Sequence, residues 1–577
     1  MSATLTRITG TLAEARPLRD ASLYELVRVG ARGLLGEVIR FSGDTATLQI
    51  FEDTTGLAVG APVVATGASL AAELGPGLLG AVLDGVGRPL ARLAELTGDF
   101  VAPGAAAPTL DRARRWRFVA RARAGDRVSS GDVLGEVDER LAHRILVPPG
   151  ASGEIADLAD GDYTVDEPIG HLGDGTVLRL AQRWPIRTPR PVAQRLPSDR
   201  ALVTGQRVFD LLFPLAEGGT VAVPGGFGTG KTIVEHALAK FAAADVVVFV
   251  GCGERGNEMA ELLEDFPKLV DPNTGRPVME RTVLVVNTSN MPVVAREASV
   301  YLGVTIAEYY RDMGHRVAMM VDSLSRWAEA LRDIAARLQE MPGEEGYPTA
   351  MASRLGALYE RAGRARALGA PERTGAVTMV CAISPPGGDF SEPVTQASLR
   401  VAGGLWALDA QLARARQFPA VDWSTSYSLY AETVLPAMGA TWPVLRTRIL
   451  ALLQRDAELR EIASLIGNEE LEDRDRLVLA IASMVREHVL GQNAFDPNDA
   501  SSPLAKTGAL AELSIAALDA ADAAITAGRE LDALPVAAVR RALAAVRRAP
   551  EAERDARIAE ARHAVEALHS PAPAGGA

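Results

Sequence analysis

One segment constrains this chain more than any other. An apolar run, Thr220–Val223, leads into the pattern G-x-x-x-x-G-K-T at residues 225–232, and the residues from Ile233 onward have the composition of a helix. In a strand–loop–helix unit of this kind, glycines let backbone N–H groups turn inward around a polyphosphate, and the helix N-terminus adds a partial positive charge. The sequence therefore predicts an α/β fold with a phosphate-binding loop after one strand.

The phosphate loop is defined by eight residues. They are Gly225, Gly226, Phe227, Gly228, Thr229, Gly230, Lys231 and Thr232. We expect Lys231 to reach the β- and γ-phosphates of a nucleotide and the Thr232 hydroxyl to ligate Mg²⁺. The alternative is a glycine-rich turn that binds nothing, and the strand before the loop and the helix after it disfavour that interpretation.

Two further apolar runs end in charged residues. Val246–Val250 leads through two glycines to Glu254 and Arg255, and Val317–Val321 ends at Asp322. Open α/β sheets bind ligands at the carboxyl ends of their strands. We therefore expect Glu254 to orient a water molecule against the γ-phosphoryl group and Arg255 to stabilise charge on that group. We expect Asp322 to hold Mg²⁺, directly or through a water molecule.

Each of these residues also has a simpler interpretation. Glu254 and Arg255 could form a surface ion pair, and many strands end in Asp. Their order along the chain, after a phosphate loop, favours the functional interpretation. The two cysteines, Cys252 and Cys381, have no ligand or nucleophile pattern around them, so we expect small buried thiols.

Composition excludes several classes of protein. A chain of 577 residues should form several domains. Its net charge of −13 and pI near 5.3 argue against a general nucleic-acid binder. Two cysteines cannot supply a disulfide framework, and the histidines form no metal-binding pattern. There is no apolar run long enough to span a membrane and no secretion signal, so we expect neither a membrane span nor a secreted protein.

The pattern of apolar residues predicts a series of domains. Residues 36–41 and 45–50 alternate with period two, which favours a small antiparallel barrel or sandwich. A second β-like segment, punctuated by glycine, covers about 110–185 and should be a structural or interaction module. A helix is expected at Val300–Met313, ended by Gly314. Buried strands are expected at Thr220–Val223, Val246–Val250, Val283–Val286, Val317–Val321 and Val377–Ile383.

Longer motifs add a resemblance to a known family. The phosphate loop, the segment GCGERGNEM at 251–259, the segment SPPGGDFSEPV at 384–394 and the segment QNAFDP at 492–497 closely resemble the catalytic A subunit of V/A-type rotary ATPases. The runs at 75–80 and 84–90 also match that family. The resemblance covers nearly the whole chain, although the last seventy or so residues diverge.

The resemblance implies an architecture that agrees with the pattern of strands and helices. It has an α/β P-loop NTPase core of the RecA type, an N-terminal β-barrel, an inserted β-rich bulge domain and a C-terminal helical domain. On this basis the expected boundaries are 1–72 for the barrel, 73–109 for a connecting segment, 110–188 for the bulge domain, 189–434 for the nucleotide-binding domain, 435–569 for the helical domain and 570–577 for a disordered tail.

The family also implies roles for individual residues. Lys231 and Thr232 match its phosphate and Mg²⁺ residues, Glu254 matches the carboxylate that polarises the attacking water, and Arg255 matches the adjacent γ-phosphate contact. Phe418 and Phe495 resemble the aromatic residues that flank adenine, a contact for which each ring needs only its π-face. The implied ligands are therefore ATP or ADP and Mg²⁺.

The resemblance further implies partners. In the family, three A and three B subunits alternate in an A3B3 ring around a central stalk, with peripheral stalks beside it, and the ring is joined to a membrane sector that moves H⁺ or Na⁺. The expected location is the cytoplasmic face of a membrane. We expect no nucleic acid among the partners. Two alternatives remain: a non-catalytic ring subunit that holds nucleotide, and a hexameric ATPase that translocates RNA or protein.

Overall fold

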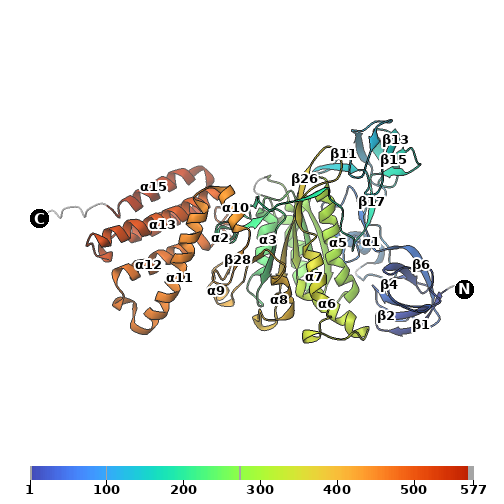
Figure 1. The fold of residues 1–577 in the computed structure, drawn as a ribbon, viewed down its shortest axis with the longest axis horizontal. Coiled ribbons are helices and arrows are strands. Elements are labelled where there is room, and N and C mark those ends of the chain that lie inside the picture. The colour runs from blue at the N-terminus through green and yellow to red at the C-terminus, as the bar shows by residue number, and fades with distance from the viewer. Residues whose placement is uncertain (1–2, 99, 272–273, 570–577) are drawn as a thin grey trace. The chain divides into compact units, whose positions relative to one another are not determined.

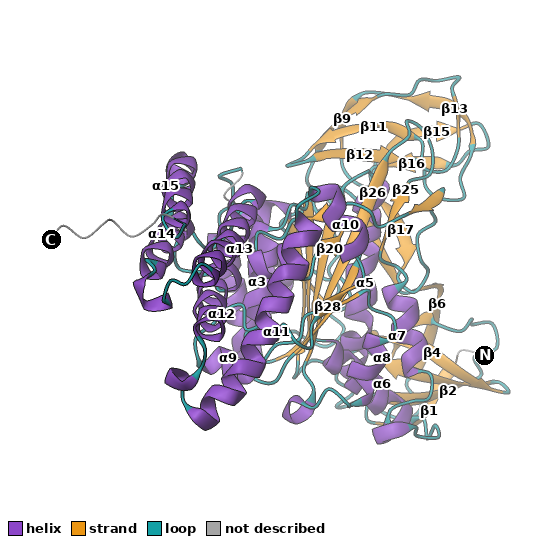
Figure 2. Cartoon of the chain, turned by 60° about the vertical axis from the view of Figure 1, so that its left-hand side comes forward, coloured by secondary structure: helices purple, strands orange, loops and turns teal. Residues whose placement is uncertain are grey.

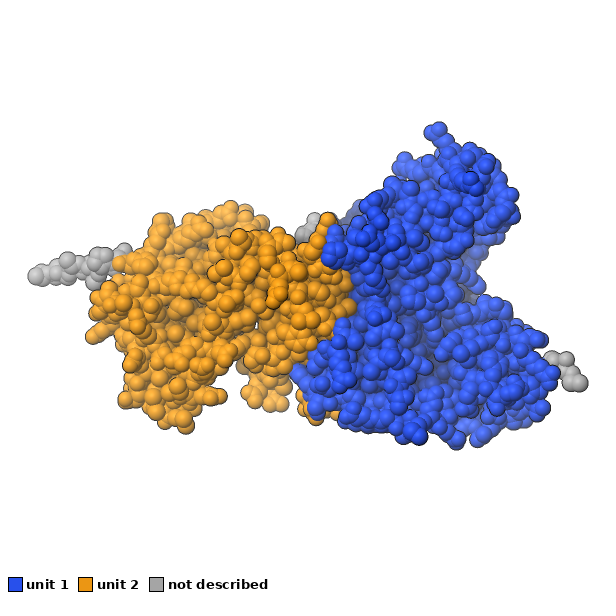
Figure 3. Space-filling view, viewed as in Figure 1, with its two compact units in different colours: residues 1–197, 244–385, 390–401 blue, residues 198–243, 386–389, 402–577 orange. Residues whose placement is uncertain are grey.

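The computed structural model describes residues 3–98, 100–271 and 274–569, and Figure 1 follows its elements along the chain. The chain divides into two compact units, shown in two colours in Figure 3. Unit 1 comprises residues 1–197, 244–385 and 390–401, and unit 2 comprises residues 198–243, 386–389 and 402–577. The predicted disordered tail, 570–577, lies outside the described residues.

Unit 1 begins with a closed barrel in the strand order β1-β2-β5-β4-β3-β6. The strands are β1 (Ala3–Thr9), β2 (Leu12–Arg16), β3 (Glu25–Val29), β4 (Leu34–Ser42), β5 (Thr45–Ile50) and β6 (Pro62–Ser69). Val27, Leu48 and Ile50 are fully buried in its core. The alternating runs predicted from the sequence form the β4–β5 hairpin. Closure of the sheet, which leaves no unpaired edge, decides between barrel and sandwich.

A β-rich insertion follows, as the sequence predicts. It contains two four-stranded sheets, in the orders β10-β13-β15-β16 and β12-β11-β9-β14. The strands are β9 (Trp116–Ala120), β10 (Arg127–Val128), β11 (Val133–Asp138), β12 (Ala142–Leu146), β13 (Gly153–Leu158), β14 (Gly161–Tyr163), β15 (Pro168–Leu172) and β16 (Val177–Arg179). Their buried residues include Phe118, Val137 and Ile155, so the insertion has a core of its own.

The chain leaves this insertion through β17 (Gln182–Pro185), which pairs with β7 (Ala71–Leu74), the strand that follows the barrel. The short helix α1 (Leu90–Thr97) lies between the barrel and the insertion in sequence. The two connections therefore run side by side.

The largest layer of unit 1 is a parallel sheet in the order β26-β24-β22-β23-β8. The strands are β8 (Val82–Asp84), β22 (Val246–Glu254), β23 (Thr282–Thr288), β24 (Arg316–Asp322) and β26 (Thr374–Ile383), and β25 (Gly363–Arg366) adds an antiparallel edge that β18 (Gln194–Leu196) extends. The four Val-rich runs predicted as buried strands in this unit are confirmed. Parallel strands covered on both faces require such continuous apolar sequence.

Besides α1, the described α-helices of unit 1 are α4 (Gly256–Asp265), α5 (Val293–Asp312), α6 (Leu324–Arg337), α7 (Met351–Tyr359) and α8 (Pro393–Leu399). Helix α5 ends where the sequence predicts, next to Gly314, but it begins at Val293 and not at Val300. The part of α5 that was not predicted contains Arg296 and Glu297, and charged residues such as these usually indicate an exposed position. Both side chains are buried, so their charge concealed the helical periodicity.

Unit 2 contains β21 (Thr220–Pro224), the fifth predicted buried strand, in the order β21-β27-β28. Its other elements in the nucleotide-binding region are α2 (Arg207–Leu212), β19 (Ala201–Leu202), β20 (Leu215–Ala216), α3 (Lys231–Phe241), β27 (Gly404–Leu405), α9 (Ala410–Arg414) and β28 (Tyr427–Ser428).

The rest of unit 2 is helical, as Figure 2 shows by its purple ribbons. The helices are α10 (Ala431–Met438), α11 (Trp442–Ile466), α12 (Asp473–Met484), a π-helical turn at Val485–Leu490, α13 (Leu504–Thr526), α14 (Val536–Arg548) and α15 (Arg554–Glu566). No helix among the described residues has the length and apolarity needed to cross a bilayer.

Candidate active site

The phosphate loop connects β21 to α3 in unit 2. Its last glycine, Gly230, is the residue before the helix and has a φ of 89°, a left-handed conformation that favours glycine. Lys231 and Thr232 are therefore the first two residues of α3, where helical N–H groups lack partners within the helix. The predicted phosphate-binding residues thus lie at a helix N-terminus, which is a favourable place for an anion.

The side chain of Lys231 lies over this loop. Its Nζ donates hydrogen bonds to the backbone carbonyls of Gly225 and Gly226, at 2.6 and 2.9 Å. Thr229, which is buried, donates from Oγ1 to the carbonyl of Gly226 at 2.9 Å and so closes the turn from inside. The ammonium group is thus held at the concave side of the loop, where it can neutralise phosphate charge.

The two predicted adenine-binding aromatic residues are also in unit 2. A Cβ atom added to Gly230 would lie 3.3 Å from Cε1 of Phe418, so this ring packs directly against the phosphate loop. Phe495 is 97% exposed. The backbone N–H of Gln492, three residues before Phe495, donates to the carbonyl of Phe418 at 2.7 Å. This hydrogen bond joins the two segments that carry the rings.

The predicted water-orienting carboxylate lies in unit 1, at the end of β22. The pairing of β22 with β23 shifts register between Cys252 and Glu254, so β22 contains a bulge there. Bulges change the direction of a side chain and often occur beside active sites. Gly253, within the bulge, has a φ of 76°, and the carbonyl of Glu254 accepts a hydrogen bond from the N–H of Ser289 at 2.8 Å. This geometry fixes the backbone that carries Glu254.

Arg255 directly precedes α4 as its N-terminal cap residue. Its side chain is 58% exposed, and its Nη1 lies 4.0 Å from a carboxylate oxygen of Glu258 on the first turn of the helix. Such an exposed ion pair contributes little to stability.

Asp322 is the last residue of β24 and is buried. It pairs in register with Gly251 of β22, so Asp322 and Glu254 lie at the same edge of the parallel sheet of unit 1. The peptide bond between Asp322 and Ser323 is cis. Each carboxylate thus lies at the end of a predicted strand, and the two strands are neighbours in the sheet.

The residues proposed for Mg²⁺ fit that ion. The hydroxyl of Thr232 and the carboxylate of Asp322 are hard oxygen donors, as Mg²⁺ requires. In the part of the chain that the structure describes, no group of three or more His, Cys, Asp or Glu side chains could hold a metal ion. Mg²⁺ in phosphate-transfer sites uses one or two protein oxygens together with substrate phosphates and water, so a complete protein cage is not required.

The sequence did not indicate two arginines beside Glu254. Arg296 of α5 is buried, and its Nη2 donates to the carbonyl of Ser289 at 2.9 Å. A Cβ atom on Gly253 would lie 2.7 Å from Cδ of Arg296, so the bulge rests on this side chain. Both contacts depend on where α5 crosses the sheet, and the only signal in the sequence is that Arg296 follows Pro292 at a helix start.

Arg326 of α6 is the second. It pairs with Glu329 at 2.9 Å. Burial lowers the pKa of Arg326, but the carboxylates of Glu329, Glu254 and Glu258 outweigh that effect and raise it. Arg326 therefore supplies positive charge near Glu254.

The two cysteines are buried thiols, as predicted. Burial raises the pKa of Cys252 to about 12, so this residue, although two positions from Glu254, is a poor nucleophile. Its Sγ donates to the carbonyl of Arg296 at 3.4 Å. Cys252 is thus a packing residue under the bulge.

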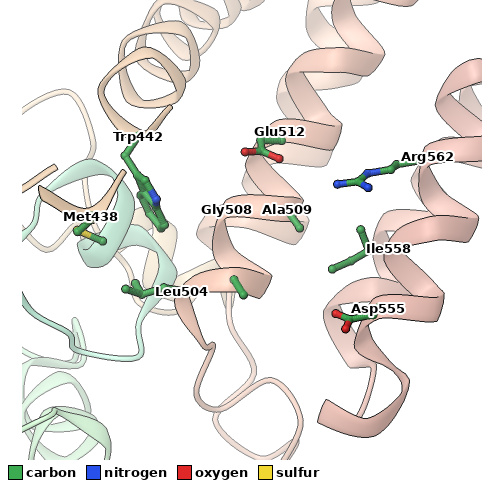
Figure 4. A pocket seen from close by; sticks show the side chains of 10 residues that line it. Met438, Trp442, Leu504, Gly508, Ala509, Glu512, Asp555, Ile558 and Arg562 are labelled. Carbon is green, nitrogen blue, oxygen red and sulfur yellow. The ribbon is translucent and has the colours of Figure 1, made fainter. Parts of the chain in front are cut away.

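One pocket of about 470 Å³ lies among the helices of unit 2, between Trp442, Gly508 and Ile558 (Figure 4). Small residues of α13 form one side and α15 the other, and the side chains of Glu512 and Arg562 lie at its border. The residues that line it include none of the predicted site residues, so it is separate from the phosphate loop.

The fold and the loop define a P-loop nucleotide-binding protein with a barrel before its core and a helical domain after it. The family model described as "ATP synthase alpha/beta family, nucleotide-binding domain" matches residues 205–428. The beta-barrel, barrel-sandwich and V and A type C-terminal domains of ATP synthases match residues 5–67, 107–187 and 436–534.

Individual proteins give the same result. The V-type ATP synthase alpha chain of Anaeromyxobacter sp. (strain K) is 56% identical over 534 residues, which cover 92% of each chain. The A subunit of the A-type ATP synthase of Thermococcus onnurineus is 50% identical over 569 residues, 97% of each chain. The chain belongs to this family of V-type and A-type ATP synthase alpha (A) chains.

A solved structure shares the fold. The ATPase EscN from the type III secretion system of enteropathogenic E. coli aligns with a TM-score of 0.62 at 22% identity, covering 88% of this chain and 98% of that one. This likeness shows the fold alone.

Proposed function

We propose that this chain is the catalytic subunit of a V/A-type rotary ATPase, which hydrolyses or synthesises ATP and couples that reaction to the transport of H⁺ or Na⁺. The observation that carries the proposal is the phosphate loop, with Lys231 held over its carbonyls at the N-terminus of α3. The names of relatives at 50 to 56% identity support the coupling to ATP synthesis.

The proposed reaction is in-line attack of water on the γ-phosphoryl group of ATP. Lys231 and the backbone N–H groups of the loop bind the phosphates, and Glu254 accepts a hydrogen bond from the attacking water and orients it. Arg255 stabilises charge on the transferred oxygens. Mg²⁺, held through Thr232 and Asp322, would neutralise further charge on the β- and γ-phosphates. Phe418 and Phe495 would hold the adenine ring between their faces.

A non-catalytic role is disfavoured by the residues themselves. A protein that only holds nucleotide has no need of a water-orienting carboxylate, yet this chain has both Lys231 and Glu254. The bulge in β22 and the Ser289 hydrogen bond fix the backbone of Glu254, as a catalytic group requires.

The proposed partners follow from the family. The chain would alternate with B subunits in an A3B3 ring at the cytoplasmic face of a membrane, joined to central and peripheral stalks and to a membrane sector. Nucleotide would bind where A and B subunits meet, and the B subunit would supply an arginine to the γ-phosphate. An arginine supplied in this way increases the rate about 10³- to 10⁵-fold.

Reconstitution tests this proposal. The purified full-length chain should show feeble ATPase activity, and activity should rise by orders of magnitude when the ring is assembled with B subunits. A monomer that turns over ATP as fast as the assembled ring would overturn the shared-site proposal. ATPase assays of membranes that contain the complete assembly, with and without an ion gradient, would then test the coupling to transport.

A further inference from the structure

A buried ion pair in unit 2 involves the segment of residues 489–499, which carries Phe495. Arg207, the first residue of α2, and Asp499 are both fully inaccessible to solvent, and Nη1 of Arg207 lies 2.8 Å from Oδ1 of Asp499. A buried charge is costly unless its partner and hydrogen bonds compensate it. The cost of burying each charge is offset only while the other is beside it, so the pair links Arg207 to Asp499.

Arg207 also binds the backbone of this segment. Its Nε donates to the carbonyl of Val489 at 3.1 Å, and its Nη2 donates to the carbonyl of Gly491 at 2.6 Å. The backbone N–H of Arg207 donates to Oε1 of Gln492 at 2.6 Å. The rigid, planar fork of a guanidinium is suited to several acceptors at once, and an ammonium group cannot reproduce that geometry.

The same segment is joined to both candidate base-binding rings. The backbone N–H of Gln492 donates to the carbonyl of Phe418 at 2.7 Å. Oδ2 of Asp499 accepts from the N–H of Asn493 at 2.8 Å, and Oδ1 of Asn493 accepts from the N–H of Phe495 at 3.1 Å. Arg207 is thus linked to the backbone of Phe418 through hydrogen bonds with Gln492, and to the backbone of Phe495 through its ion pair with Asp499 and the hydrogen bonds of Asn493.

Phe495 depends on these contacts because its own side chain is 97% exposed. A ring without packing around it takes its position from its backbone. Phe418, in contrast, packs against Gly230 of the phosphate loop. The distance and angle between the two rings therefore depend on how the 489–499 segment is held against α2.

We propose that Arg207 is a positioning residue for the base of the bound nucleotide: through Gly491, Gln492 and Asp499 it sets the position of Phe495 relative to Phe418. The inference rests on the proposed function, because it requires nucleotide binding at the phosphate loop. It assigns to Arg207 no contact with the nucleotide. Its effect is on affinity for the base and not on affinity for the phosphates.

Binding of two ligands to the ring assembled with B subunits tests this role, because the proposed nucleotide site lies where the subunits meet. The affinities for ADP and for inorganic pyrophosphate are measured with wild type, Arg207→Lys and Asp499→Asn, both variants being conservative in volume. Loss of base stacking lowers affinity about 5- to 150-fold. We expect each variant to bind ADP at least about fivefold more weakly while its affinity for pyrophosphate changes less than about twofold.

Arg446→Lys is the matched control. Arg446 of α11 donates to the carbonyl of Leu212 at the other end of α2, at 2.7 Å, away from the 489–499 segment. The affinities of the Arg446→Lys variant for ADP and for pyrophosphate should equal those of wild type. A double-mutant cycle adds a second readout: in a Phe495→Ala background the Arg207→Lys change should lose most of its effect on ADP, because the residue it positions is absent.

Two results would overturn the inference. One is an equal loss of ADP and pyrophosphate affinity, which would mean that the ion pair supports the fold and the phosphate loop alike. The other is unchanged ADP affinity in both variants. A wild-type ring that binds ADP no more tightly than pyrophosphate would count against the base site itself, and a wild-type ring that binds neither ligand would overturn the proposed function.

Discussion

The carbonyl of Glu254 accepts a hydrogen bond from the backbone N–H of Ser289 at 2.8 Å, just beyond the bulge that ends β22. The carbonyl of Ser289 in turn accepts from Nη2 of Arg296 at 2.9 Å. One buried arginine thus holds the turn that holds the proposed water-orienting carboxylate. The position of Glu254 depends on α5 as well as on its own strand.

Replacement of Arg296 should therefore impair turnover more than binding. Arg296→Lys removes the fork that reaches Ser289, and a displacement of about 1 Å at a reacting group can cost about 100-fold in rate. We predict a fall in kcat of about 10- to 100-fold with little change in KM for ATP, measured on the assembled ring. Arg281→Lys is the control, because Arg281 is a largely buried arginine of unit 1 that bonds the carbonyl of Ala244. Equal kcat in wild type and Arg296→Lys would show that Glu254 is fixed without Arg296.

Lys231 makes a separate prediction about affinity. Lys231→Met removes the ammonium group over the phosphate loop while it keeps the length of the side chain. A hydrogen bond to a charged group contributes about 1.5–3 kcal/mol, so affinity for ATP should fall about 10- to 150-fold in equilibrium binding. Lys240→Met, at the other end of α3, should bind ATP as wild type does. Comparable losses in the two variants would point to damage of the helix and not to loss of a phosphate contact.

The fold was predictable where one local signal determines it. The strands β21 to β24 and β26 can be predicted from their Val-rich sequences, because both faces of such strands are buried. The β4–β5 hairpin can be predicted from the alternation of apolar and polar residues. Closure into a barrel cannot, because it depends on pairing between β1 and β6, which are far apart in sequence. The start of α5 was missed because Arg296 and Glu297 are charged and yet buried.

The candidate site divides in the same way. The phosphate loop, Glu254 and Asp322 follow strands that the sequence reveals, and Phe418 and Phe495 were identified through the family resemblance. The only signal of the bulge in the sequence is the glycine at position 253. The pairing of Arg207 with Asp499 leaves none, because the two residues meet only after the helical domain has folded against α2.

Two glutamates share one arginine in unit 1, and the titration of one of them, Glu37, should make the stability of the chain depend on pH. Nη2 of Arg187 lies 3.2 Å from Oε2 of Glu37 and 2.7 Å from Oε2 of Glu297. Burial raises the pKa of Glu37 from 4.5 to about 7 although Arg187 lowers it, and Glu297 adds to the rise. The folded state therefore binds the proton more tightly than the unfolded state does. This contribution to stability is complete below pH 4.5 and is lost as pH rises through about 7.

Glu37→Gln should remove this dependence, because the amide cannot ionise. The variant should gain stability relative to wild type as pH rises from 5 to 8, by up to about 3 kcal/mol, since one pKa unit corresponds to about 1.4 kcal/mol. Urea unfolding of both chains at several pH values measures the difference. A difference that is constant from pH 5 to 8 would mean that Glu37 does not titrate in this range.

The most direct test of the proposed mechanism replaces Glu254 by Gln in the assembled ring and measures ATP binding and steady-state hydrolysis on the same preparation. Glu264→Gln, an exposed change on α4, serves as the matched control. We predict that Glu254→Gln binds ATP with wild-type affinity and loses about 10²- to 10⁴-fold in turnover, because a neutral amide cannot polarise the attacking water as the carboxylate does. Hydrolysis at the wild-type rate in that variant would contradict the mechanism.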